Sequence, residues 1–405
     1  MSAAPASNDA ITRVLNGRRA DFVPVAPSYE TLGPLQFYRM ELRWRKWWHR
    51  LDQAGTDLLP VHYEMCLQVE LEIYIDVMER CYSRPAWLAL PHNDTAEEIN
   101  GYAVVRRGDD LFWLSPSGYE SWIPPNREAQ HEVEIIQRSM PWADYWDRAN
   151  STAIRNAAAR PVHRLQPIPE PSPEQVRASA ASQRYDLARA IAKRYPDDAP
   201  FYTNGTSPYN TLEGTFGFQP MMSALVEQPD LVHRILGNSM PRPSARLLAE
   251  RRLGVSIMFI EECMASTDII SPKMYLEFAH PYDREAIQLY ESMGFRTVLY
   301  FSGNLMPLLP YLNELPFTAI IFEEDRKNYG IDLAHIRRAL PDKVLFGNVD
   351  AAWLERATDR EVLDEAKRQI EIAGPDKFIL SVGSPFTPGT SLDRVKLFCE
   401  STRMI

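Results

Sequence analysis

The sequence predicts an α/β fold, a (β/α)8 TIM barrel with an N-terminal extension and an inserted β-hairpin. From Gly254 onward, short β-branched apolar runs alternate with segments of helical spacing, which is the pattern of a parallel sheet. The chain has 405 residues, 45% of them apolar, which is enough material for a barrel with additions. We expect a single domain over residues 1–405, with the extension at residues 1–20 and an insertion at residues 95–175.

The N-terminal half contains fewer regular signals. Phe22–Pro27 and Asp57–His62 are apolar runs that we predict as inner strands, and Trp44–His49 lies on a helix between them. Tyr102–Trp113 alternates apolar and polar residues around a Gly-Asp pair, which is typical of a β-hairpin. Arg160–Glu174 is rich in proline and predicts a connector inside the domain.

The C-terminal half is more regular. Pro272–Met293 carries large apolar residues at three- and four-residue steps, and Gly294 follows it as a helix-ending glycine. The other predicted elements are strands at Gly254–Ile260, Phe295–Phe301, Phe317–Phe322, Lys343–Phe346 and Lys377–Val382, and helices from about Leu305 and at Asp332–Leu340, Asp359–Ala373 and Ser391–Thr402.

Composition excludes several classes of function. The net charge of -10 argues against nucleic acid and against anionic membranes as main partners. Four cysteines lie far apart with no Cys-x-x-Cys pair, so neither a zinc finger nor a disulfide framework is indicated. The first residues lack the apolar core of a signal peptide, and no apolar run is long enough to span a membrane. We therefore expect a cytoplasmic protein.

Polar side chains follow most of the predicted strands, where a barrel places its active site. Carboxylates that share a cavity raise one another's pKa, so one of them can hold a proton for acid–base chemistry. The alternative is that these carboxylates are solvated or cap the next helix. The residues that follow the strands are Glu64, Glu261, Glu262, Cys263, Tyr300, Ser302, Asn304, Glu323, Glu324, Asp325, Asn348, Asp350, Ser384 and Thr387.

His62, Glu64 and Cys66 lie two residues apart after the second predicted strand. If the strand continues, its two-residue period turns all three toward one face. A metal site or a Cys-His nucleophile pair is one interpretation, and a core histidine with a buried thiol is the other. The tryptophans near Trp47 are interpreted as packing, with a pocket wall as the alternative.

Four segments follow one another in a characteristic order: Ile270–Tyr282, the Ser302-Gly303-Asn304 turn, Phe346–Leu354 and Ser381–Lys396. Together they resemble the uroporphyrinogen decarboxylase superfamily, which includes porphyrinogen decarboxylases and zinc-dependent, corrinoid-linked methyltransferases. The resemblance extends from about Pro200 to the C-terminus and includes Gly214–Leu236. It implies a (β/α)8 barrel and suggests a homodimer.

The chain departs from both signature sets of this superfamily. In the methyltransferases the turn reads His-x-Cys-Gly-Asn and holds zinc, whereas here those positions are Tyr300 and Ser302, and a further expected cysteine near Ser384 is missing. Tyr and Ser oxygens are poor zinc ligands. The decarboxylases' Arg-Gln-Ala-Gly-Arg motif is replaced by Ala26-Pro27-Ser28-Tyr29-Glu30, and an acidic mouth without those arginines repels a substrate with eight carboxylates.

We therefore expect a metal-free, cofactor-free acid–base enzyme, a decarboxylase or related carbon–carbon lyase acting on a small organic substrate other than uroporphyrinogen. Glu64 matches the acidic residue that follows an early strand in the decarboxylases. The expected catalytic residues are Glu64, Glu262 and Tyr300, and the expected substrate-binding residues are His62, Tyr202, Glu261, Ser302, Asn304, Glu323, Asp350 and Ser384.

Two alternatives stay open. The first is transfer of a methyl group from a small methylated substrate to a corrinoid protein or a thiol, which the Ser-Gly-Asn turn favours. The second is a catalytically inactive barrel that binds a ligand, because a fold alone does not establish an activity.

Overall fold

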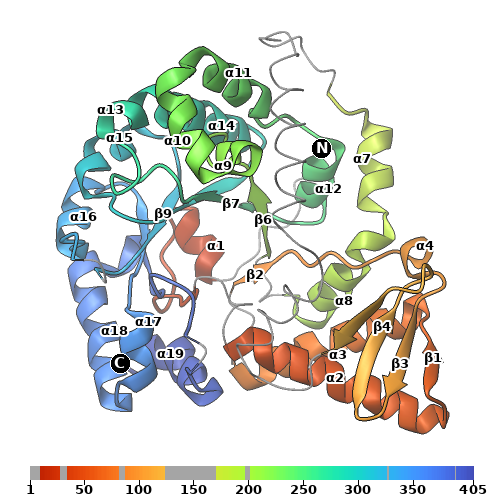
Figure 1. Ribbon diagram of the computed structural model, residues 1–405. Helices are drawn as coiled ribbons and strands as arrows, with labels where there is room; N and C mark the ends of the chain where they lie inside the picture. The colour runs from red at the N-terminus through yellow and green to blue at the C-terminus, as the bar shows by residue number, and fades with distance from the viewer. Residues whose placement is uncertain are drawn as a thin grey trace.

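The computed structural model describes residues 10–27, 34–81, 87–123, 170–196, 201–325, 328–387 and 389–405. A curled parallel sheet carries helices on its outer side, and a smaller antiparallel sheet lies beside it (Figure 1). Most of the residues predicted as an insertion and connector, 124–169, lie outside the described residues.

The larger sheet has seven parallel strands in the described part of the chain, in the order β11-β10-β9-β8-β7-β6-β2. Val25 forms a parallel bridge with Leu380, which adds an eighth position beside β11. No ladder joins Val25 to β2 among the described residues, so the sheet is a half-barrel consistent with a TIM-like fold. The strands are β2 (Leu88–Ala89), β6 (Phe201–Gly205), β7 (Ile257–Glu262), β8 (Arg296–Phe301), β9 (Ala319–Phe322), β10 (Val344–Phe346) and β11 (Phe378–Ile379).

Helices follow most of these strands, as the alternation of the sequence predicts. Helix α18 (Asp359–Ala373) has the predicted bounds, begins with a capping box at Thr358 and ends at Gly374. The other α-helices are α1 (Ala10–Leu15), α2 (Pro34–Ala54), α3 (Tyr63–Cys81), α4 (Ala96–Ile99), α7 (Pro173–Ala180), α8 (Asp186–Arg194), α9 (Thr211–Phe216), α10 (Phe218–Glu227), α11 (Pro229–Ser239), α12 (Ala245–Arg252), α13 (Pro272–Met274), α14 (His280–Ser292), α15 (Leu309–Glu314), α16 (Leu333–Ala339), α17 (Ala351–Arg356) and α19 (Leu392–Met404).

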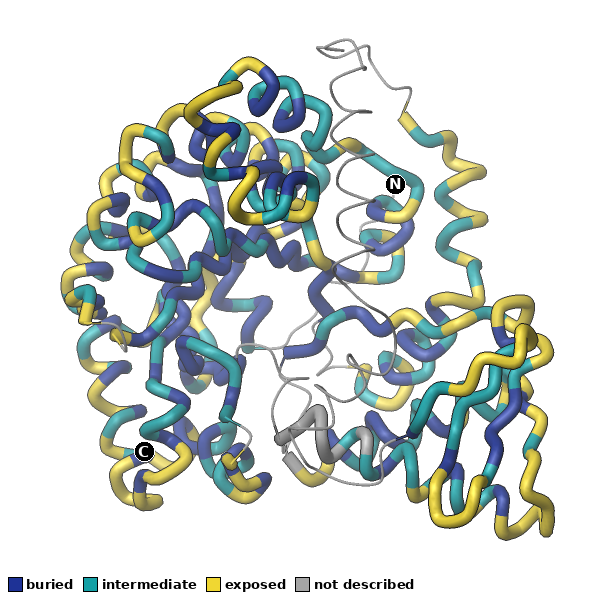
Figure 2. The backbone as a smooth tube through the Cα atoms, in the orientation of Figure 1, coloured by how far each residue is buried: buried dark blue, intermediate teal, exposed yellow. Residues whose placement is uncertain are grey.

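The pleat of the strands divides the core into two clusters. Along β7, Ile257 and Phe259 belong to the inner cluster, while Met258 and Ile260 pack outward against the helices. Helix α1 contributes Ile11, Val14 and Leu15 to the inner cluster. The strands are accordingly the most deeply buried part of the backbone in Figure 2. The curled sheet therefore encloses a packed core, as the sheet of a (β/α)8 barrel does.

The prediction that Asp57–His62 forms an inner barrel strand is wrong. β1 (Leu58–Pro60) pairs antiparallel with β3 (Ala103–Arg107) in the smaller sheet, whose order is β1-β3-β4-β5. β4 (Asp110–Leu114) pairs with β3 so that Arg107 faces Asp110 across a two-residue turn, and β5 (Glu120–Ile123) completes the sheet. The apolar run correctly predicts a strand, but it does not show which sheet the strand joins.

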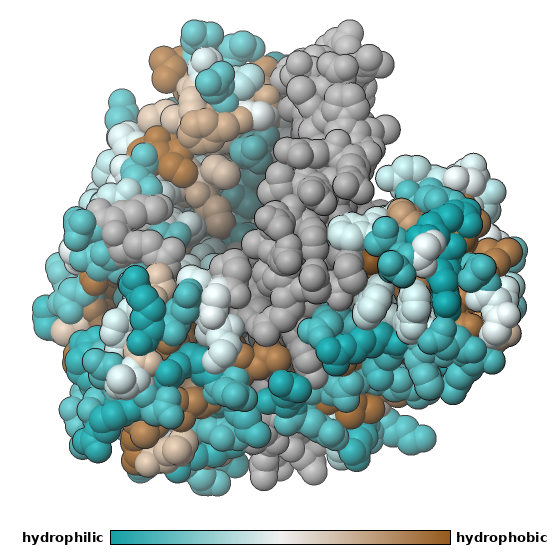
Figure 3. Space-filling view, turned by 60° about the horizontal axis from the view of Figure 1, so that its bottom comes forward, coloured by the Kyte–Doolittle hydropathy of each residue, from teal (hydrophilic) through white to brown (hydrophobic). Residues whose placement is uncertain are grey.

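The surface gives no sign of a large apolar face in the view of Figure 3, where hydrophobic residues lie in small, separate patches among hydrophilic ones. Of the helices described, none combines the length and apolar character needed to cross a membrane.

The packing of α1 predicts a measurable effect on stability. Replacing the buried Ile11 by alanine should lower the free energy of unfolding by about 2–5 kcal/mol, because it opens a cavity inside the curled sheet. Denaturant unfolding monitored by circular dichroism would measure this, with the exposed Arg18→Ala as the control. Equal stability of the two variants would show that α1 does not belong to the core.

Candidate active site

The carboxyl ends of β7, β8 and β9 bring together a group of polar side chains from the predicted set. Because Ile257 and Phe259 face the inner cluster, the pleat also turns Glu261 toward it, and Cys263 packs against that cluster. Two hydrogen bonds organise the group. Ser302 Oγ donates to Glu323 Oε1 at 2.9 Å, and Cys263 Sγ donates to Glu261 Oε1 at 3.4 Å.

Tyr300 lies in the same group, buried and stacked on Phe259 at 6.0 Å between ring centroids. Burial raises the pKa of the Tyr300 phenol, and the neighbouring Cys263 and Glu323 raise it further. Burial and the negative charge of Glu261 likewise raise the pKa of the Cys263 thiol. At neutral pH both groups therefore keep their protons and act as hydrogen-bond donors.

Glu262 does not share this space with Glu261, contrary to the expected arrangement. Consecutive residues of a strand point to opposite faces, so the Glu262 side chain turns outward and is fully buried beneath the helices. Its Oε1 accepts the Met264 amide at 3.1 Å, and its backbone carbonyl accepts the Ser302 amide at 3.1 Å. Glu262 therefore supports the strand ends from behind.

Ser207 couples Glu262 to Asp283, a buried residue of α14 that sequence reasoning missed although it directly follows a motif of the resemblance. Ser207 Oγ contacts Glu262 Oε2 and lies 3.2 Å from Asp283 Oδ1, and it also accepts the Asn210 amide at 3.2 Å. A hydroxyl has one proton to donate. One of the two carboxyl groups must therefore be protonated and donate to Ser207.

The electrostatics of the pair agree with this proton count. Burial raises the pKa of Glu262 to about 7, and burial together with the Glu262 charge raises the pKa of Asp283 well above its ordinary value. Among the described residues, the buried hydroxyls of Tyr209 and Tyr275 have no hydrogen-bond partner. Tyr275 begins a π-helical turn that ends at Ala279, a feature found often at functional sites.

Three predicted residues next to the strand ends have local structural contacts. Asn304 Oδ1 accepts the Met306 amide at 3.1 Å, and Asp350 caps α17 by accepting the Ala352 amide at 2.8 Å. Ser384 Oγ donates to Glu324 Oε1 at 3.1 Å. These contacts show a role in positioning the loops, and substrate binding by the three residues stays a prediction.

The remaining predicted residues lie elsewhere. Tyr202 is in the inner core, where it stacks on Trp87 at 4.6 Å. His62 and Glu64 are exposed, and Glu64 lies in the first turn of α3 rather than after a barrel strand. The expected placement of His62, Glu64 and Cys66 on one strand face is therefore wrong, because the chain turns into a helix at Tyr63.

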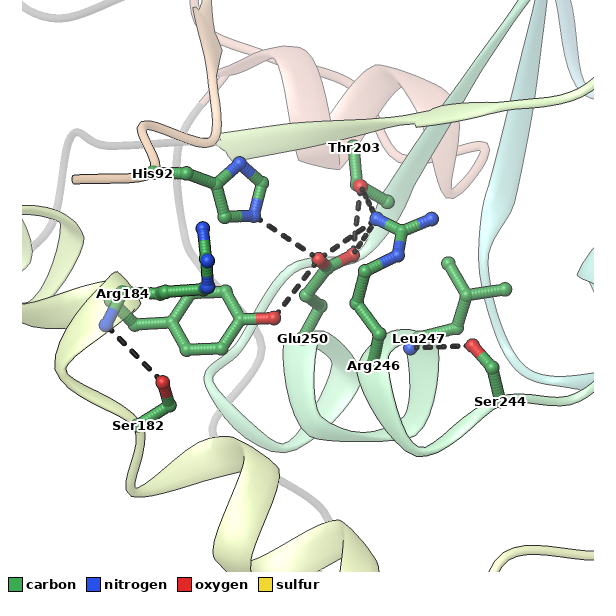
Figure 4. Close-up of polar contacts among 9 residues, drawn as sticks. His92, Ser182, Arg184, Thr203, Ser244, Arg246, Leu247 and Glu250 are labelled. Carbon is green, nitrogen blue, oxygen red and sulfur yellow. Dashed lines mark hydrogen bonds and ion pairs between the residues drawn. The ribbon is translucent and has the colours of Figure 1, made fainter. Parts of the chain in front are cut away.

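The structure also contains a cavity of about 570 Å³ between α2, α3, the smaller sheet and the loop after β2. None of the strand-end side chains described above lines it. Trp47 is buried and forms part of its wall, so this residue serves both packing and the pocket. His92 in the loop after β2 also lines the cavity, and its ring contacts Glu250 of α12 (Figure 4).

A comparison with known protein families shows to which family the chain belongs. The family described as uroporphyrinogen decarboxylase (URO-D) matches residues 151–405, which is more than half of the chain. The chain belongs to the URO-D family. This confirms the resemblance predicted from the four motifs, which all lie inside the matched residues.

The individual relatives are distant. A uroporphyrinogen decarboxylase of Prochlorococcus marinus is 28% identical over 185 residues, which cover 44% of this chain and 49% of the relative. A methylated-thiol–coenzyme M methyltransferase of Methanosarcina mazei is 21% identical, over 53% of this chain and 55% of the relative. The chain thus spans about half the length of the curated relatives it matches. A solved methyltransferase from Methanosarcina mazei covers 97% of this chain and 96% of its own length, with 17% identity and a TM-score of 0.54, which shows a shared fold.

Tyr300 and Ser302 stand at the two positions where the resemblance implies zinc ligands, and both present neutral oxygens. The neighbouring Cys263 thiol gives its hydrogen bond to Glu261. In the described part of the chain, no three His, Cys, Asp or Glu side chains come close enough to hold a metal ion. Tyr300 and Ser302 therefore supply neither the thiolate nor the imidazole that zinc takes in such sites.

The shared proton predicts how stability depends on pH. Because the pKa of Glu262 rises from 4.5 to about 7 on folding, its contribution is full below about pH 4.5 and is lost as the pH rises through about 7. Glu262→Gln keeps a neutral group in place and should flatten the fall in stability over this window. Denaturant unfolding at several pH values would measure it, with the exposed Glu285→Gln as the control. An unchanged pH profile in Glu262→Gln would contradict the assignment.

The Ser302-Gly303-Asn304 turn predicts a second effect. Gly303 has a φ of +83°, and an added Cβ would collide with Ser266 Oγ and Asp268 Oδ1. Gly303→Ala should destabilise the fold by more than Gly17→Ala, whose φ is +69° but whose Cβ would meet no atom within 4 Å. The control isolates the cost of the left-handed backbone, about 1–2 kcal/mol. Equal losses of stability in the two variants, measured by thermal unfolding, would contradict this prediction. They would show that the turn rearranges to make room for the added methyl group.

Proposed function

We propose that the protein is an acid–base enzyme that works without zinc, as a decarboxylase or related carbon–carbon lyase on a small organic substrate other than uroporphyrinogen. The observation that carries the proposal is the hydrogen bond from Ser302 to Glu323 beside the neutral phenol of Tyr300. It places a carboxylate and two hydroxyl groups at the ends of adjacent parallel strands, where enzymes of this fold class have their active sites.

Each group has a defined role in this proposal. Tyr300 donates a hydrogen bond to the anion that develops when the carbon–carbon bond breaks and its electron pair stays on the substrate, while Ser302 gives its single proton to Glu323 and holds that carboxylate in place. Because its pKa is raised, Tyr300 is a poor source of the proton that the carbanion then takes up. Glu323 takes up a proton from solvent and passes it to the carbanion, and Glu261 is the second candidate for this role.

The substrate is expected to be small and not highly anionic. Glu261 and Glu323 place two carboxyl groups at the strand ends, and the arginine motif of the resembled decarboxylases is absent. Negative charge that faces a polycarboxylate repels it. A porphyrinogen with eight carboxylates is therefore a poor match for this site.

Methyl transfer to a corrinoid protein or a thiol is the second candidate. The acidic strand ends favour it, because they would attract a cationic methyl donor, and the Ser302-Gly303-Asn304 turn resembles that of the methyltransferases. Against it, an acceptor thiol has to be activated as a thiolate, and Tyr300 and Ser302 are not the zinc ligands that would activate it. An inactive ligand-binding barrel is the third candidate.

The test begins with a panel of small aromatic and aliphatic carboxylic acids, with release of CO2 as the readout. With an active substrate in hand, Glu323→Gln should lower kcat by about 10²- to 10⁴-fold, the usual contribution of a proton-transferring group. Glu314→Gln on α15 is the matched control, because this glutamate pairs with Arg284 away from the strand ends.

Three results would contradict the proposal. Full activity of Glu323→Gln would show that Glu323 does not transfer the proton. A loss of kcat in the exposed Glu64→Gln as large as that in Glu323→Gln would assign the acid–base role to Glu64. Turnover of a methylated substrate with no reaction of any acid would favour the methyl-transfer alternative.

A further inference from the structure

The 570 Å³ cavity beside β2 has the size and lining of a small-molecule site. Volumes of about 300–1,000 Å³ and walls of aromatic side chains are usual for such sites. Trp47 of α2 and Trp113 of β4 supply aromatic walls. Their rings meet edge to face at 5.8 Å, which gives the cavity apolar ring surface that a planar ligand can pack against.

His92 is one of several polar residues that line this cavity, with Arg39, Arg43, Glu70 and Asp94 among the others, and Glu250 orients its ring. Glu250 is fully buried and accepts hydrogen bonds from Thr203 Oγ1 at 2.7 Å, Arg246 Nη1 at 3.0 Å and Tyr185 OH at 3.2 Å. Burial works to raise the pKa of Glu250, but the hydrogen bonds from His92 and Thr203 hold it below its ordinary value. Glu250 is therefore an ionised carboxylate that only accepts hydrogen bonds.

The ionised Glu250 determines which nitrogen of the His92 ring faces it with a proton. His92 Nε2 lies 3.4 Å from Glu250 Oε1, so Nε2 carries a proton and Nδ1 is left to accept a hydrogen bond from a ligand. In Figure 4 the second ring nitrogen of His92 points away from Glu250. The His92 side chain is 40% exposed.

The neighbouring polar groups of the cavity already have partners. Tyr63 OH donates to Asp186, and Asn93 Nδ2 donates to the Gln183 carbonyl at 2.9 Å. Burial raises the pKa of the Cys66 thiol to about 12, so it is not a nucleophile at neutral pH. His92 Nδ1 is thus the group in this lining best placed to receive a proton from a ligand.

We propose that this cavity binds a planar aromatic molecule with an acidic O–H group and that His92 takes the proton of that group. The O–H bond breaks, the proton moves to Nδ1, and the resulting imidazolium keeps its Nε2–H bond to Glu250. The ligand remains as an oxyanion paired with the new Nδ1–H. This site goes beyond the proposed lyase function, because it does not use the strand-end groups Glu261, Tyr300, Ser302 and Glu323.

The test uses 4-nitrophenol as the probe, since its phenolate absorbs visible light and its phenol form does not. The full-length protein is titrated at a pH where the free probe is mainly phenol. Quenching of tryptophan fluorescence reports binding, and visible absorbance reports proton transfer. Wild type should show saturable quenching together with a rise in the phenolate band.

Two variants test the two parts of the proposal separately. His92→Gln should abolish the rise of the phenolate band and weaken binding about tenfold, the usual cost of a hydrogen bond to a charged group. Ser121→Phe on β5 should block binding by filling the cavity. The exposed His49→Gln is the matched control and should leave both the quenching and the phenolate band unchanged. Glu323→Gln should also leave these two readouts of 4-nitrophenol binding unchanged, which separates this site from the proposed lyase site.

Three results would overturn the proposal. They are the absence of saturable quenching in wild type, a phenolate band that persists in His92→Gln, and unchanged binding in Ser121→Phe. Circular dichroism checks that each variant is folded. If His92→Gln does not fold, binding to Ser121→Phe alone tests whether the probe occupies the cavity.

Discussion

The buried residue Glu262 holds together the carboxyl ends of the parallel strands at which the candidate site lies. Its backbone carbonyl holds the Ser302 amide, its side chain holds the Met264 amide, and through Ser207 it is tied to Asp283 on α14. Because the strand pleat turns Glu262 outward, Glu261 and Cys263 on either side of it face inward. A carboxyl group that keeps a proton can hold these contacts without burying two negative charges.

Much of the fold could be predicted because its signals are local. The alternation of β-branched runs with helical spacing after Gly254 corresponds to β7–β11 and their helices. The strand predicted at Asp57–His62 was assigned to the wrong sheet. It pairs with Ala103–Val105, and its own apolar sequence does not reveal which strand it pairs with. Consequently the early carboxylate Glu64 was expected at the barrel mouth and instead lies on a helix.

The candidate site was only partly predictable for a related reason. Tyr300, Ser302 and Glu323 follow clear strands, so their grouping could be expected. The opposite directions of Glu261 and Glu262 follow from the pleat and could also have been expected. The contact between His92 and Glu250 joins residues 158 positions apart, and β2 is only two residues long. No sequence pattern therefore predicts this contact.

The metal content of the purified protein decides whether this URO-D member works without zinc, as we propose. Elemental analysis of protein prepared without chelators, in medium containing zinc, should find far less than one zinc ion per chain, since Tyr300 and Ser302 occupy the positions where the resemblance implies zinc ligands. One zinc ion per chain that is lost in Ser302→Ala would contradict this proposal.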